Sequence, residues 1–146
     1  MTSLLQNSRR LLALLVLPLG LALAVGPATS ASADPGSSER ARNYYGAIAL
    51  SIDGGGGLSY DYRTKAKATR VAKQKCKRKT NYPGRCQVAV WVRNGCAAVS
   101  VKRNADGFIT RYGWAVRRYK GPAISAAQHK CGRNCKRYAF VCTTRP

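Results

Sequence analysis

Six cysteines, all between residues 76 and 142, are the feature that most constrains how this chain can fold. They are Cys76, Cys86, Cys96, Cys131, Cys135 and Cys142. An even number of cysteines in a small exported chain is typical of a disulfide framework, although the sequence leaves the pairing open. A zinc site is the alternative, because His129, Cys131 and Cys135 form an H-x-C-x3-C cluster. Zinc binds reduced thiolates, which exported proteins rarely keep, so disulfides are the preferred interpretation.

The N-terminus has the three parts of a secretory signal peptide. Arg9 and Arg10 provide positive charge, residues 11–25 form an apolar run, and Ala-Ser-Ala at 31–33 predicts cleavage before Asp34. The apolar run has 15 residues, fewer than the ~20 that span a bilayer. We therefore expect a secreted, extracellular protein without a transmembrane segment after the signal peptide is removed.

This cleavage predicts a signal peptide over 1–33, a flexible N-terminal tail over 34–43 and a single cysteine-rich α+β domain over 44–146. Hydrophobic residues make up 45% of the chain, enough for a packed core. The chain has 26 basic and 5 acidic side chains; without the two arginines of residues 1–33 the balance is 24 to 5, a net charge of +19. Five carboxylates and one histidine are too few for most acid–base or carboxylate–metal chemistry, so we expect no catalytic residue, metal or cofactor.

Hydrophobic periodicity predicts the same element order twice along the chain, strand–strand–helix–strand. The first copy has strands at 45–52, 58–62 and 86–93 and a helix at 64–79; the second has strands at 96–101, 111–119 and 136–143 and a helix at 122–131. Thr64 is the predicted N-cap of the first helix. The fold class is therefore a small disulfide-bonded α+β domain, an antiparallel sheet with two helices built from a duplicated unit.

The two predicted helices share one pattern of small residues. Ala68, Ala72 and Cys76 in the first helix match Ala123, Ala127 and Cys131 in the second. Residues spaced by four lie on one face of a helix, and small residues there let the helix lie close to a sheet. Chance similarity of alanine-rich helices is the alternative to a duplication.

The repeat suggests a disulfide pairing. Cys76–Cys86 and Cys131–Cys135 would each join the end of a helix to the start of the next strand. Cys96–Cys142 would then be the long-range bond that links the two copies.

Several segments together resemble a known family. They are Tyr-Gly-Ala-Ile-Ala at 45–49, the two Ala-xxx-Ala-xxx-Cys helices, the Cys-x-Val-x-Val-Trp strand at 86–91 and Asn-Gly-Cys-Ala-Ala at 94–98. The chain is similar to the domain-of-unknown-function family 4189, small exported bacterial proteins. The resemblance implies export, a compact cysteine-bonded α+β domain and a duplicated motif, and it supplies no catalytic or binding residue. The lysines and arginines on the helices depart from the family pattern.

Nine of the 17 residues from 63 to 79 are basic and none is acidic. Dense like charge destabilises a compact domain, so a polyanionic partner is the simplest reason for it. The candidate polyanion-binding residues are Arg63, Lys65, Lys67, Arg70, Lys73, Lys77, Arg78, Lys79, Arg117 and Arg118.

Four aromatic residues are interpreted by strand alternation. Trp91 and Tyr119 are candidate stacking platforms for nucleic-acid bases, Tyr119 on a strand face with Arg111. A core role is favoured for Trp91. Tyr112 and Trp114 are assigned to the core.

The sequence thus predicts a secreted monomer whose function is non-catalytic binding of an anionic polymer or surface: nucleic acid, anionic lipid or cell-wall polymer. A secreted effector or inhibitor that binds an acidic protein partner is the alternative. A small ribonuclease is disfavoured, because His129 has only Asp53, Asp61 or Asp106 as a possible acid–base partner.

Overall fold

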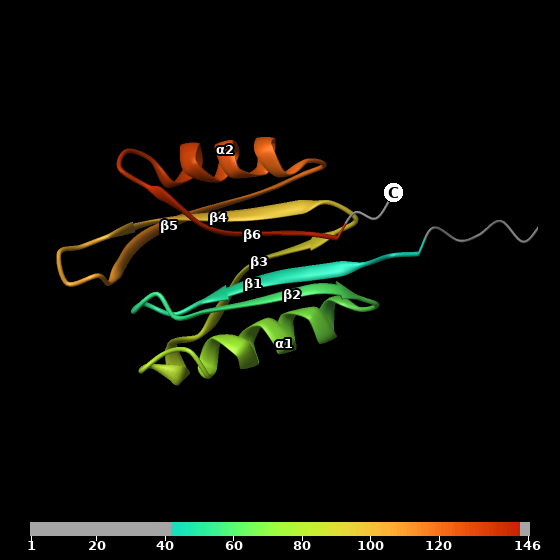
Figure 1. The fold of residues 1–146 in the computed structure, drawn as a ribbon, viewed down its shortest axis with the longest axis horizontal. Helices are drawn as coiled ribbons and strands as arrows, with labels where there is room; N and C mark the ends of the chain where they lie inside the picture. The colour runs from blue at the N-terminus through green and yellow to red at the C-terminus, as the bar shows by residue number, and fades with distance from the viewer. Residues whose placement is uncertain (1–41, 144–146) are drawn as a thin grey trace, which may run out of the picture. The chain divides into compact units, whose positions relative to one another are not determined.

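A computed structural model describes residues 42–143 of the chain (Figure 1). The predicted signal peptide at 1–33 and all but the last two residues of the tail at 34–43 lie outside the described residues. The elements are β1 (Tyr45–Leu50), β2 (Gly56–Tyr62), α1 (Lys65–Lys77), a short 3-10 helix (Pro83–Arg85), β3 (Gln87–Arg93), β4 (Cys96–Arg103), β5 (Ile109–Arg117), α2 (Lys120–Cys131) and β6 (Lys136–Cys142).

The strands form two antiparallel sheets of three strands each, where the sequence predicted one sheet. The first has the order β2-β1-β3 and the second β5-β4-β6. The central strands β1 and β4 are buried along nearly their whole length, so both of their faces need cover. Two stacked sheets with a helix outside each satisfy this requirement, whereas one six-stranded sheet with two helices on one face would leave the other face in water.

Large side chains fill the space between the sheets. Ile48 and Leu50 of β1 and Val90 and Val92 of β3 form one cluster there with residues of the second sheet. The members from the second sheet are Ala97, Val99, Val101 and Val141. The domain is therefore layered as helix, sheet, sheet, helix, with α1 and α2 on the two outer faces (Figure 1).

Small side chains form the contacts between each helix and its sheet. The buried residues of α1 are Ala68, Ala72 and Cys76, which pack on Ala47 and Ala49 of β1. The second sheet repeats this arrangement, with Ala123 and Ala127 of α2 packed on Ala98 and Ala115. The predicted small-residue faces are therefore the faces that meet the sheets.

A glycine in each sheet lies directly under the helix backbone. A Cβ placed on Gly57 of β2 would meet the carbonyl oxygen of Ala72 and the backbone nitrogen of Cys76. A Cβ placed on Gly113 of β5 would meet the equivalent atoms of Ala127 and Cys131. Only glycine allows this approach, and the sequence analysis did not identify either position.

Three disulfides are present in the domain. Cys76–Cys86 joins the last turn of α1 to the segment before β3, and Cys131–Cys135 joins the end of α2 to the turn before β6. Cys96–Cys142 links the neighbouring strands β4 and β6. These are the pairs that the repeat suggested. Cys96 and Cys142 both belong to the second half, however, so this bond does not link the two copies.

The two halves share element order and strand order, but common order alone does not establish descent from one unit, and the duplication stays a prediction.

The assignment of Tyr112 and Trp114 to the core is wrong. Their side chains are 45% and 44% exposed, although they do share one face of β5. The covered face of β5 is the opposite one, where Gly113 and Ala115 lie under α2. β5 is an edge strand, so its inner face borders a cleft instead of the packed centre. Alternation predicts that Tyr112 and Trp114 share one face of the strand, but it does not show which of the two faces is covered.

β1 differs from the prediction at its end, and β3 departs from simple alternation near its start. β1 ends at Leu50, so Ile52 does not continue the apolar face and is 40% exposed. A register shift between the pairs of Ile48 and Ala49 places Val88 on the helix side of the first sheet, while Val90 and Val92 face the second sheet. A bulge of this kind reverses the alternation locally.

Candidate polyanion-binding surface

Helix α1 presents its basic residues to solvent. Thr64 is the N-cap, and its hydroxyl accepts a hydrogen bond from the Lys67 backbone N–H at 3.2 Å. The three buried residues occupy the side facing the sheet. The predicted residues of this segment are all exposed: Arg63, Lys65, Lys67, Arg70, Lys73, Lys77, Arg78 and Lys79.

Lys75 and Lys77 in the last turn of α1 lie where the helix dipole favours a positive charge, but the charge at the start of the helix does not stabilise it. Its first turn has no acidic residue, and Lys65 and Lys67 lie where the helix dipole disfavours a positive charge. Lys73 and Lys77 are four residues apart, a spacing at which like charges cost about 0.2–0.5 kcal/mol per pair. These charges therefore need a reason other than folding.

Arg117 and Arg118, the remaining predicted residues, lie at the other sheet. Arg117 ends β5, and Arg118 follows it before α2 begins. Register places Arg117 opposite Cys96, just after the tight turn that follows Arg93. Arg93 in turn pairs with Tyr45 at the start of β1. This end of the two sheets thus brings Arg93 and Arg117 together, and Arg93 was not among the predicted binding residues.

Basic side chains lie over several aromatic rings. Lys65 Nζ is 4.1 Å from the centre of the Trp91 ring, and Lys130 Nζ is 4.9 Å from that of Trp114. Arg63 lies over Tyr44 at 4.6 Å. Cation–π contacts hold the long side chains near the aromatic residues.

The two candidate stacking residues differ in position. Trp91 is 40% exposed at the edge of the first sheet, so the core role favoured for it is wrong. Tyr119 is 63% exposed, but it does not share a strand face with Arg111, because β5 ends at Arg117 and Tyr119 is the N-cap of α2.

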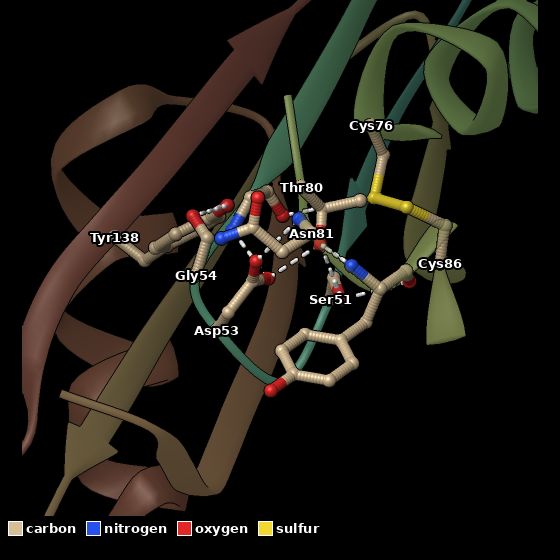
Figure 2. The surroundings of a disulfide bond; sticks show 10 residues. Ser51, Asp53, Gly54, Cys76, Thr80, Asn81, Cys86 and Tyr138 are labelled. Carbon is tan, nitrogen blue, oxygen red and sulfur yellow. Dashed lines mark hydrogen bonds between the residues drawn. A yellow bond between two sulfur atoms is a disulfide. The ribbon is translucent and has the colours of Figure 1, made fainter. Parts of the chain in front are cut away.

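Asp53 is the centre of a hydrogen-bonded junction beside the Cys76–Cys86 disulfide (Figure 2). The Thr80 hydroxyl donates to Asp53 Oδ1 at 2.7 Å, and the backbone N–H groups of Gly55 and Asn81 donate to the same carboxylate. These hydrogen bonds, that of Thr80 first, lower the pKa of Asp53 to about 2. The carboxylate therefore ties the β1–β2 turn to the loop after α1 and stays ionised at neutral pH.

The same turn is held from the second sheet. The Tyr138 hydroxyl of β6 donates to the carbonyl of Gly54 at 3.1 Å, and burial raises the pKa of Tyr138 (Figure 2). A backbone hydrogen bond of 2.6 Å runs from Ile109 to the carbonyl of Ile52. The glycine-rich segment is thus anchored by both sheets.

Two of the three aspartates considered as acid–base partners of His129 form hydrogen bonds with other residues. Asp53 is engaged with Thr80 and Asn81 in the first half, whereas His129 is exposed on α2 outside the second sheet. Asp106 accepts a hydrogen bond from Asn104 in the β4–β5 turn.

Over residues 42–143, no group of three or more His, Cys, Asp or Glu side chains is placed to hold a metal ion. Cys131 and Cys135 are bonded to each other, so the cluster with His129 lacks free thiolates. Within the same residues, neither helix combines the length and the hydropathy that crossing a membrane requires.

The fold defines a small α+β domain in which three disulfides secure two helix-covered, three-stranded sheets. A family model, Domain of unknown function (DUF4189), matches residues 45–144, and the chain belongs to this family. Neither a curated protein nor a solved structure matches the chain. The family carries no catalytic assignment, so the function has to be argued from the surface.

Proposed function

We propose that the protein is secreted and binds an anionic polymer or surface without catalysis, with α1 as the main contact. The observation that supports this most directly is the solvent side of residues 63–79, where eight basic side chains are exposed and no acidic residue occurs. Because repulsion among these charges is a cost to the folded domain, binding of a polyanion is the function that accounts for them.

Secretion rests on two features. Three disulfides fit an oxidising compartment. The signal-peptide pattern of residues 1–33 gives a route to that compartment. Outside the cell, the available polyanions include nucleic acid, anionic lipid and wall polymers.

Absence of catalysis is proposed because Asp53 and Asp106, two of the three candidate acid–base partners of His129, accept hydrogen bonds from other residues. Acid–base cleavage of RNA needs two positioned proton-transfer groups near neutral pH. The low pKa of Asp53 makes its carboxylate a poor proton carrier at that pH.

The test is fluorescence anisotropy of labelled single-stranded RNA titrated with the oxidised, exported protein at several salt concentrations. The variant Lys73→Gln, Lys77→Gln, Arg78→Gln and Lys79→Gln removes four exposed charges from the end of α1. It should bind more weakly, and the slope of log affinity against log salt should fall by about 2–3, since each phosphate contact to a single strand contributes about 0.7.

A matched control removes four exposed charges near β6 and the end of β4: Lys102→Gln, Arg133→Gln, Lys136→Gln and Arg137→Gln. It should retain a slope closer to that of the parent. An equal effect of both variants would assign binding to net charge alone, and no effect of the α1 variant would remove α1 from the site.

The same samples distinguish the alternatives. RNA that is shortened on a gel would establish a nuclease and overturn the non-catalytic proposal. Failure to bind at low salt would exclude RNA as the polyanion. Binding that is also absent with anionic vesicles and with inorganic polyphosphate would favour an acidic protein partner, whose shaped interface depends less steeply on salt.

A further inference from the structure

An open cleft runs between the edge strands of the two sheets. Its larger part has a volume of about 650 Å³ and is lined by residues 88–93 of β3 on one side and by Trp114 and Val116 of β5 on the other. A smaller part of about 230 Å³ is lined by Gln87 and Ala89 of β3 and by residues 109–112 of β5. Ala89 borders both parts, so the cleft follows the two edges along their length. The larger part has the size of a small-molecule site, about 300–1,000 Å³.

Both tryptophans of the protein line the larger part of this cleft. Trp91 and Trp114 are 40% and 44% exposed. Lys65 Nζ lies over the Trp91 ring and Lys130 Nζ over the Trp114 ring, so a base that stacks on either ring would displace a flexible lysine head group. Tyr45 supports Trp91 from the neighbouring strand, with ring centres 6.3 Å apart. Large aromatic rings left half in water on a rigid strand are unusual for a core and typical of a binding surface.

The rim of the cleft is basic. Lys65 and Arg93 border the larger part, and Arg85 and Arg111 border the smaller part. No acidic residue lines either part. The cleft therefore combines flat aromatic surface inside with positive charge at the edge, and Lys65 belongs to both the cleft and the basic face of α1.

We propose that this cleft binds single-stranded nucleic acid, with bases against Trp91 and Trp114 and phosphates on Lys65 and Arg93. The inference rests on the proposed function and specifies its polyanion. Stacking on aromatic rings beside a basic groove is how proteins hold single strands without sequence preference.

Other polyanions use the cleft less well. Polyphosphate has no rings and gains nothing from the tryptophans. A duplex keeps its bases stacked on one another, so it presents phosphates, sugars and base edges but not the base faces that would stack on the tryptophans. An acyl chain gains free energy by leaving water, which needs an enclosed slot, whereas this cleft leaves both tryptophans partly in solvent.

The test compares two labelled DNA oligonucleotides of equal length, one with bases and one with abasic sites throughout, so that both have the same phosphates. Because the only two tryptophans lie in the cleft, intrinsic fluorescence reports on this site. The oligonucleotide with bases should quench tryptophan emission and bind at least about fivefold more tightly than the abasic one. Trp91→Ala and Trp114→Ala should each reduce that preference, while their abasic affinity stays at the parent value.

Tyr119→Ala is the control, because Tyr119 is an exposed aromatic residue beside a basic one but outside the cleft lining. It should leave the preference unchanged. Trp91→Phe and Trp114→Phe keep a ring and should retain most of the preference, which separates loss of stacking from loss of folding.

Equal affinity and equal emission with both oligonucleotides would overturn the cleft site while leaving charge-driven binding through α1 intact. No binding of either oligonucleotide would overturn the nucleic-acid proposal as a whole. A change of emission with phosphatidylglycerol vesicles and none with oligonucleotides would overturn it in favour of a lipid.

Discussion

Replacing Gly57 with alanine is expected to destabilise the domain more than any exposed substitution. The added Cβ would meet the Ala72 carbonyl oxygen, the Cys76 nitrogen at 2.5 Å and the Lys75 Cβ at 2.9 Å. Two of these atoms belong to the helix backbone and cannot move aside as a side-chain end can. The Cys76–Cys86 disulfide holds this turn of α1, so the helix cannot tilt away freely.

The cost follows from the shift that the helix must make. Inserting a methyl group into a packed contact costs about 1–3 kcal/mol of folding stability. Because the added methyl group meets backbone atoms, we expect a cost in the upper half of this range, about 2–3 kcal/mol. For a domain of this size, each kcal/mol lowers the melting temperature by about 4–8 °C. Gly57→Ala should therefore melt roughly 8–24 °C below the parent, as measured by circular dichroism on the oxidised protein.

A second glycine provides the control. Gly121 lies in the first turn of α2, and a Cβ there would meet nothing within 4 Å. Gly121→Ala should leave stability unchanged or raise it by up to about 1 kcal/mol, because alanine restricts the unfolded chain. A Gly57→Ala protein that melts with the parent, or equal losses in both variants, would refute the close approach of helix and sheet.

Two further predictions concern stability. Asp53→Asn should destabilise the domain by roughly 1 kcal/mol near pH 6, because the group is partly exposed and screened by solvent. The pKa of Asp53 falls from 3.8 to about 2 on folding, so this contribution is present above about pH 4 and is lost as the pH falls towards 2. Urea unfolding at both pH values tests it, and a difference that persists at pH 2 would contradict it. Cys96→Ala with Cys142→Ala opens a bond of sequence separation 46, and Cys131→Ala with Cys135→Ala one of separation 4. The chain-entropy model gives losses of about 4 and about 2 kcal/mol; urea midpoints in the reverse order would contradict it.

The helices and strands could be predicted from the sequence, but the stacking of two separate sheets could not. Period-two alternation and the capping residue Thr64 are local signals, so most bounds were predicted to within a few residues. Whether β4 continues the first sheet or starts a second one depends on contacts across the whole domain. The signal that could have indicated two sheets is the double burial of β1 and β4, where small and large apolar residues alternate without a polar face.

The candidate site was predicted in part for the same reason. Charge on a helix whose apolar face is known must point to solvent, so the exposure of Lys73 and Lys77 followed from Ala72 and Cys76. The sequence does not indicate the cleft, because Trp114 alternates with small residues and this pattern fits a covered face equally well. Gly113, between Tyr112 and Trp114, was the available signal, since a glycine in a strand often marks the close approach of another backbone.

The close packing of each helix on its sheet explains how one domain can carry so much positive charge. The buried residues of α1 are only Ala68, Ala72 and Cys76. Around them the sheet contributes small residues together with the partly buried side chains of Tyr45, Tyr62 and Val88, so no long side chain of the helix itself is buried in this contact. The core between the sheets is apolar and does not involve the helix. Lysines and arginines on the outer side of α1 can therefore be changed without disturbing either contact, whereas their mutual repulsion remains a cost to the folded state. Weaker binding after their replacement would thus report on the ligand and not on the fold.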